Sequence, residues 1–239
     1  MIYIQKNKDG IPHHFDCACA MYGTMDLGLE YKLLTFEEVQ SGKWDSLIRS
    51  NLFVGSVEFM TEVFSKIGIE QPRLPLNNLR PFEEMKLGDF KYEKPVFIKP
   101  RSIKAFTGFV VDEYSRSMLN TLDPELDIIV QEVLPNITSE WRCYIFRRKL
   151  VAIKHYSGDT IQNLNKLRDY IEDIYLELDD KNFPETFVID IGYYFNGLDE
   201  SLSIIEFNDM WAIGNYGVDN DLYVRMLKDR YFDIIKNGK

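Results

Sequence analysis

The 239-residue chain is poor in cysteine and has no long apolar run. It has three cysteines, so at least one is unpaired, which is typical of a reducing compartment. No segment reaches the roughly 18 apolar residues of a membrane-spanning helix. The N-terminal segment MIYIQKNKDG lacks the apolar core of a signal peptide. The sequence therefore predicts a cytoplasmic protein without a membrane span.

Basic residues are also in short supply. The chain has 28 Lys and Arg against 38 Asp and Glu, a net charge of −10 and a pI of about 4.9. This balance makes nucleic acid and acidic membranes unfavourable partners, although it leaves room for a local basic groove. The hydrophobic content of 45% and the charged content of 28% are ordinary for a globular protein with one large or two modest domains.

Several familiar catalytic motifs are missing. The chain has no G-x-x-x-x-G-K-[ST] phosphate loop, no G-x-G-x-x-G fingerprint and no G-x-S-x-G elbow. Three histidines, His13, His14 and His155, give little support for a hydrolase triad. The spacing H-H-x-x-C-x-C at 13–19 matches no established zinc pattern, so we expect these residues to lie in a loop or in the core.

Residues 1–78 have the pattern of a small α/β domain. MIYI and NLFVGS resemble strands, and Thr35 followed by Glu38 forms a capping box that predicts a helix from Phe36. Residues 57–67 place apolar side chains at helical spacing, and Gly68 follows where a helix would end. Residues 70–82, with three prolines, are the best candidate for a linker.

Residues 79–239 have the pattern of a second domain that is rich in antiparallel strands. VFIK and FVV flank a polar loop, and Pro100 should end the first of these strands after Lys99. IIVQEVLP is a further strand, and residues 139–158 form a hairpin in which Glu140, Arg142 and Tyr144 share one face. We expect helices over 160–180 and 219–236, with two paired strands between them.

Those two paired strands, within 187–208, carry three polar side chains in apolar surroundings. Asp190 lies in the middle of the first strand, and Glu206 and Asn208 point the same way from the second because side chains alternate along a strand. Carboxylate and amide oxygens are ligands that suit Mg²⁺. The competing interpretation is that all three lie on the wet face of a half-exposed sheet.

Cations upstream could hold the polyphosphate that such a metal ion would accompany. They are Lys99, Lys104, Arg142 and Lys154. A surface lysine is usually only a solvated side chain. Lys99 and Lys154 are different, because apolar strand residues bracket them and an ammonium group there needs an anion.

Taken in order, these segments resemble the ATP-grasp superfamily. VFIKP with Lys99 is similar to the strand whose lysine meets the nucleotide phosphates, and VQEVL with Gln131 and Glu132 resembles the hinge segment that contacts adenine and ribose. EWRCYI with Arg142 resembles the strand whose arginine lies near the transferred phosphate. FVIDIG and IIEFND resemble the paired metal-ligand strands, with Asp190, Glu206 and Asn208 as ligands.

More narrowly, KPxxxKAFTG and EFNDMWAIGNYG resemble a compact ATP-grasp clade that is common in phage genomes, over about 85–225. In a phage protein the cytoplasm would be that of the host. The chain departs from many members in one respect, because SIKAFTG holds a single glycine, Gly108, where a glycine-rich loop often covers the phosphates. Lys104 and Thr107 are the candidates to replace that loop.

The resemblance implies an α+β (α/β) fold in which two lobes, about 85–131 and 132–239, grip ATP between antiparallel sheets. It implies an ATP- and Mg²⁺-dependent ligase that joins a carboxylate to an amine or thiol through an acylphosphate, releasing ADP and phosphate. Arg142 and Lys154 would be catalytic, and the substrates would be small molecules or peptides. The alternatives are a kinase-like phosphoryl transferase, an ATP-binding module and a plain α/β interaction protein. Trp211 and Tyr216 would either line the substrate pocket or pack a loop against the core.

Overall fold

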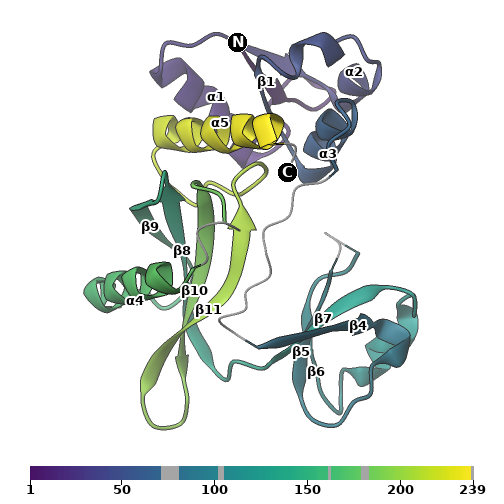
Figure 1. Cartoon of the computed structure of the whole chain (residues 1–239), viewed down its shortest axis with the longest axis vertical. Helices are drawn as coiled ribbons and strands as arrows, with labels where there is room; N and C mark the ends of the chain where they lie inside the picture. The colour runs from purple at the N-terminus through teal and green to yellow at the C-terminus, as the bar shows by residue number, and fades with distance from the viewer. Residues whose placement is uncertain (71–80, 102–104, 161–162, 179–182, 238–239) are drawn as a thin grey trace.

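The computed structural model describes the chain except residues 71–80, 102–104, 161–162, 179–182 and 238–239. Within the described residues the strands form three sheets. The N-terminal sheet is three-stranded and parallel, with β1 (Ile2–Gln5) between β2 (Tyr31–Leu34) and β3 (Leu52–Val54). The other two sheets are four-stranded and antiparallel (Figure 1).

The N-terminal unit contains the helices α1 (Phe15–Asp26), α2 (Phe36–Gln40) and α3 (Val57–Ser65). The predicted capping box is present, because the Thr35 hydroxyl accepts from Glu38 N and the Glu38 carboxylate accepts from Thr35 N. Sequence analysis missed both α1 and β2. The expectation that Cys17 and Cys19 belong to the core is confirmed, since both are buried on α1.

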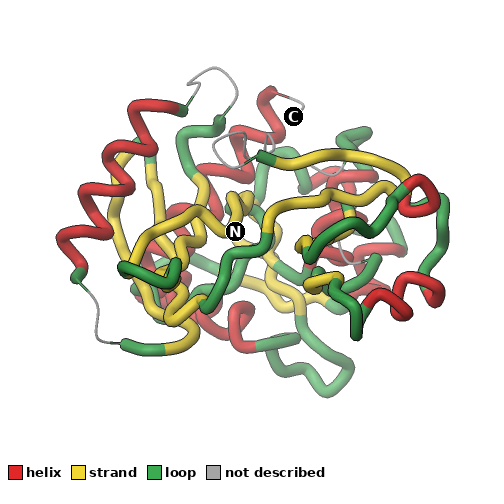
Figure 2. Tube along the Cα trace, turned by 90° about the horizontal axis from the view of Figure 1, so that it is seen from below, coloured by secondary structure: helices red, strands yellow, loops and turns green. Residues whose placement is uncertain are grey.

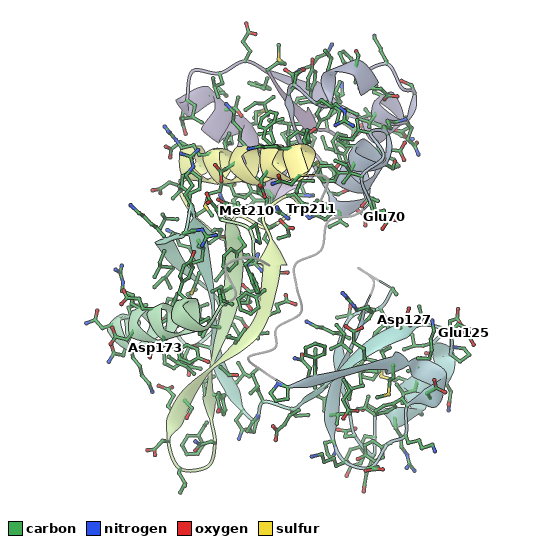
Figure 3. All side chains as sticks on the ribbon, in the orientation of Figure 1. Glu70, Glu125, Asp127, Asp173, Met210 and Trp211 are labelled. Carbon is green, nitrogen blue, oxygen red and sulfur yellow. The ribbon has the colours of Figure 1, made fainter. Side chains whose placement is uncertain are left out.

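The C-terminal helix α5 (Asn220–Asn237) packs on the N-terminal unit, where it lies against α1 and β3 (Figure 1). Its Tyr231 hydroxyl donates a hydrogen bond to the Ile48 carbonyl oxygen at 2.8 Å. Met210 and Trp211, at the end of the last strand, are buried in the same core (Figure 3). The last helix therefore shares its core with the first 70 residues, while the predicted boundary at residue 78 lies outside the described residues.

The smaller four-stranded sheet has the order β4-β7-β5-β6. The strand β4 begins at Phe82, so the predicted linker over 70–82 and the small lobe beginning at about 85 were both placed slightly wrongly. Lys99 does not end its strand, which continues through Pro100. Pairing with β6 stops at Ile98, so Pro100 is paired only with β7. The strands are β4 (Phe82–Lys86), β5 (Val96–Pro100), β6 (Phe109–Val111) and β7 (Asp127–Glu132).

The larger four-stranded sheet has the order β11-β10-β8-β9, and α4 (Leu164–Glu177) covers one face. In the view from below, α4 is the helix at the left edge, outside the strands (Figure 2). As predicted, Trp141, Cys143 and Ile145 face that helix, and Arg142 lies on the opposite face. The strands are β8 (Ile137–Phe146), β9 (Lys149–Gly158), β10 (Phe187–Phe195) and β11 (Glu200–Asp209).

The remaining described elements are single turns of 3-10 helix at Asp45–Leu47, Leu87–Asp89 and Arg116–Thr121. None of the helices in the described part of the chain has the length and apolar character needed to cross a membrane.

The contact between α1 and α5 depends on Gly23. A Cβ atom at this position would overlap the Asn220 backbone carbonyl and would lie 2.9 Å from Val224 Cγ2. We predict that Gly23→Ala lowers the free energy of unfolding by about 1–3 kcal/mol or more, because the helices must separate. Asp26→Ala, on the exposed end of the same helix, should change it by less than about 0.5 kcal/mol. Urea denaturation of both variants checks this, and a Gly23→Ala protein as stable as the parent would contradict it.

Candidate functional site

One chain of polar contacts joins the two four-stranded sheets. Lys99 Nζ on β5 lies 3.5 Å from Glu206 Oε2 on β11. The Asn208 side-chain amide donates to Glu206 Oε1 at 2.9 Å and to Asp190 Oδ2 at 3.0 Å. Arg142 then donates to both oxygens of Asp190, at 2.8 and 2.7 Å. Five of the residues selected from the sequence therefore lie in continuous contact.

Strand register explains why three of these side chains meet. Arg142 on β8 is paired with Asp190 on β10, and Asp190 is paired with Glu206 on β11. Paired residues of neighbouring strands point to the same face of a sheet. This face is opposite to the one that α4 covers.

A β-bulge places Glu206 on this face. Ile204, two residues earlier, is paired with Ile191 and packs toward α4, so strict alternation would send Glu206 the same way. The register shifts between Asp190 and Ile191, which leaves Ile205 as an extra residue in β11. The extra residue reverses the alternation, and the bulge thereby turns Glu206 and Asn208 toward the site.

The Arg142–Asp190 ion pair is almost fully removed from water, with Asp190 only 2% and Arg142 only 6% exposed. Burial raises the pKa of the Asp190 carboxyl above its ordinary value, and Glu206 and Glu140 add to the rise, while Arg142 opposes it. Burial disfavours the charge of Arg142, but its hydrogen bonds to Asp190 leave the Arg142 pKa raised. The two shifts point in opposite senses for the pair. The bidentate geometry decides the matter, and we take both groups as charged.

Two aromatic rings cover the Arg142 guanidinium. Its central carbon lies 4.5 Å from the centre of the Tyr216 ring and 5.7 Å from that of Tyr156, and the two rings are stacked. The Tyr156 hydroxyl donates to a Glu140 carboxylate oxygen at 3.0 Å. Sequence analysis assigned no role to Tyr156 or Glu140, and the alternation of residues along the hairpin was the one signal that could have suggested Glu140.

The segment that carries Tyr216 is anchored to the N-terminal unit. Gly214 O accepts from the Tyr144 hydroxyl at 3.0 Å and lies 3.5 Å from Arg142 Nη1. The next residue, Asn215, donates its backbone N–H to Asp16 Oδ1 at 2.7 Å, and His14 Nδ1 lies 3.3 Å from Asp16 Oδ2. Although burial alone would raise it, these two hydrogen bonds hold the pKa of Asp16 below its ordinary value. Asp16 was missed because nothing in the sequence marks a contact across 199 positions.

Lys154 lies on the same face as the ion pair. It is paired with Arg142 in the register of β8 and β9 and is half-buried. The structure therefore brings this predicted residue beside the site, on the strand next to Arg142.

The two predicted hinge residues diverge on the smaller sheet. Gln131 is paired with Phe97, two residues before Lys99, so Gln131 and Lys99 share a face, and Gln131 is buried. Glu132, the next residue, is exposed, and strand alternation turns it to the other face. Both residues border a cavity of about 760 Å³ whose walls come from β4, β5, β7 and the turn after β4.

Of the two residues proposed to replace a glycine-rich loop, Lys104 lies outside the described residues and Thr107 is exposed. Gly108, which follows, packs closely on β5. A Cβ atom there would lie 2.7 Å from Phe97 Cζ and 3.0 Å from Lys99 Cβ. Any larger residue at this position would therefore displace the strand that carries Lys99.

The residues at the centre of the site fit a magnesium ion. In the described part of the chain no three His, Cys, Asp or Glu side chains are close enough to hold a metal by themselves. Mg²⁺ does not need such a cage, because it is usually bound by one or two carboxylates together with phosphate oxygens. Asp190 and Glu206 converge on the Asn208 amide, and half a turn of that amide would present its oxygen to a cation.

Comparisons with known proteins agree with this geometry. The model of a family described as an ATP-grasp domain, the second family of its clade, matches residues 78–226. A search of curated proteins found no match.

Solved structures share the fold at low sequence identity. A D-alanine–D-alanine ligase from Bacillus anthracis, complexed with ATP, is 12% identical with a TM-score of 0.54, and the alignment covers 100% of this chain and 98% of that chain. An L-amino acid ligase from Bacillus licheniformis is 11% identical with a TM-score of 0.56, covering 96% and 74%. A RimK domain ATP-grasp protein from Sphaerobacter thermophilus is 11% identical with a TM-score of 0.54, covering 95% and 99%.

Removing one member of the buried ion pair should be costly. We predict that Arg142→Met lowers the free energy of unfolding by about 3–5 kcal/mol, because Asp190 is left buried without its counter-charge. Arg225→Met breaks an exposed pair with Asp221 on α5 and should cost no more than about 1 kcal/mol. Chemical denaturation measures both values. Equal stability of the two variants would show that Asp190 does not depend on Arg142.

Proposed function

The chain belongs to this family of ATP-grasp domains, and from this premise we propose that it is an ATP- and Mg²⁺-dependent ligase. It would join a carboxylate to an amine or thiol through an acylphosphate and release ADP and phosphate. The observation that carries the proposal is the continuous set of contacts from Lys99 through Glu206, Asn208 and Asp190 to Arg142. It unites a cation from one sheet with carboxylates and a cation from the other.

Phosphoryl transfer requires mainly positioning and neutralisation of charge, which these residues can supply. A substrate carboxylate oxygen attacks the γ-phosphorus of ATP as the bond to the β-phosphate oxygen breaks. Arg142 and Lys154, side by side on one sheet face, would stabilise the charge on the transferring group. Lys99 would bind the α- and β-phosphate oxygens from the smaller sheet.

The nucleotide base would lie against the smaller sheet. Gln131 shares the face of Lys99, so it can contact the base while Lys99 holds the phosphates. Glu132, at the end of β7, would contact the ribose, and Lys104 and Thr107 would cover the phosphates. Asp190, Glu206 and Asn208 would hold Mg²⁺, which when bound screens the negative charge of the phosphate oxygens.

The described cysteines do not favour covalent catalysis by the protein. Cys17, Cys19 and Cys143 are all buried. Burial raises the pKa of Cys17 to about 11, which disfavours the reactive thiolate at neutral pH. A route through a phosphorylated substrate requires no protein nucleophile.

One observation favours the alternative of an ATP-binding module without turnover. Arg142 engages both oxygens of Asp190, so this carboxylate already has a structural partner. Glu206 and Asn208 would then be the main ligands for a metal ion. Measurement of products separates this alternative from the ligase.

The first prediction concerns products. Incubation with Mg-ATP, a carboxylate and an amine should release ADP and phosphate, and ADP release should depend on both co-substrates. Mass spectrometry with a mixture of amino acids and short peptides as co-substrates would detect these products and the ligated compound. AMP and pyrophosphate would place the protein with adenylating ligases instead. ADP release without any amine would indicate a kinase.

The second prediction concerns Glu206. Glu206→Gln removes a carboxylate charge at the point where we place the metal ion, and turnover of ATP should fall by about 100-fold or more. The matched control is Glu200→Gln, an exposed position on the same strand, which should leave turnover unchanged. Steady-state kinetics at several Mg²⁺ concentrations test this. The same rate for Glu206→Gln and the parent protein would remove Glu206 from the site.

A further inference from the structure

A cavity of about 470 Å³ lies between the N-terminal unit and the segment after β11. Its volume is within the range of small-molecule pockets, about 300–1,000 Å³. The start of α1, the first turn of α3 and residues 211–216 form its walls. Two of its wall residues, Gly214 and Tyr216, are also neighbours of Arg142, through the Gly214 carbonyl oxygen and the Tyr216 ring. The cavity therefore reaches the arginine that we place beside the transferred phosphate.

The residues that we assign to ATP and Mg²⁺ do not line this cavity. Lys99, Gln131 and Glu206 are absent from its walls as the structure describes them. A second reactant could thus occupy the cavity while the nucleotide lies between the sheets.

The charges on the cavity wall favour a cation. Asp16 and Glu58 are among the lining residues, together with His13 and His14, and no lysine or arginine is found among its described lining residues. The N-terminus of α3 would otherwise attract an anion. Here it is already capped, because the Ser56 hydroxyl accepts from Phe59 N, and Glu58 lies in the first turn.

The rest of the wall is apolar. Val57, Trp211 and Leu227 supply surface for a hydrophobic ligand body. The indole N–H of Trp211 is buried and has no hydrogen-bond partner among the described residues. Buried donors are normally satisfied, so this N–H is available to an acceptor atom on a ligand.

We propose that this cavity binds the amine substrate, a primary amine on an apolar body, with Asp16 and Glu58 supplying the negative charge that attracts its ammonium group. The inference rests on the proposed ligase function. The amine nitrogen would form the new C–N bond to the acylphosphate carbonyl carbon as the C–O bond to phosphate breaks. Of the two protons that the ammonium loses, one leaves on the phosphate and one passes to water.

The experiment measures binding to the full chain by ligand-observed NMR. The probes are 2-phenylethylamine, 2-phenylethanol and 3-phenylpropanoate, which differ in the charged group on a similar body. We expect the amine to bind at least about tenfold more tightly than the other two. Glu58→Gln should weaken amine binding by about tenfold, whereas Glu37→Gln, an exposed carboxylate on α2, should leave it unchanged. Ala212→Phe, which fills the cavity, should abolish it.

Preferential binding of the carboxylate, equal amine binding by parent and Glu58→Gln, or no amine binding at tens of millimolar would overturn the inference. Thermal melting confirms that each variant is folded. Calorimetry with a non-hydrolysable Mg-ATP analogue on the same samples separates the two proposals. Nucleotide binding without amine binding refutes the cavity assignment alone, and amine binding without nucleotide binding refutes the ligase alone.

Discussion

The buried ion pair between Arg142 and Asp190 is the constraint on which the site depends. Two charges removed from water require close partners, and the bidentate contact supplies them at 2.7 and 2.8 Å. The same pair fixes the neighbouring groups, because Asn208 donates to Asp190 and the rings of Tyr156 and Tyr216 lie over Arg142. The ion pair therefore aligns the strands of the larger sheet with the segment that closes the site.

That segment connects the site to the rest of the molecule. Asp16 holds the Asn215 N–H, and α5, which follows, packs into the core of the N-terminal unit. The first 70 residues are thus part of the architecture of the site. Lys99 makes the corresponding connection on the other side, where it reaches Glu206 from the smaller sheet. The site is assembled from all three sheet-containing units.

Much of this could be predicted from local pattern. Alternating residues revealed the strands of the larger sheet, and the pair Thr35 and Glu38 revealed α2. The helix α1 was missed because it is apolar all round, with Phe15 exposed on one side and Cys17 buried on the other. The strand β4, FEEMK, has the composition of a polar segment, and it is held as an edge strand by pairing with β7. In the site, residue identities were predictable, whereas the bulge at Ile205 and the distant Asp16 follow from tertiary structure alone.

The central claim is that both four-stranded sheets hold one nucleotide and its metal ion. A crystal structure with a non-hydrolysable ATP analogue and Mn²⁺, located by anomalous scattering, tests it most directly. The account predicts the metal ion against Glu206 and Asn208, with nucleotide phosphates within reach of Lys99 and Arg142. A nucleotide bound away from these residues, or no metal ion at Glu206, would contradict it.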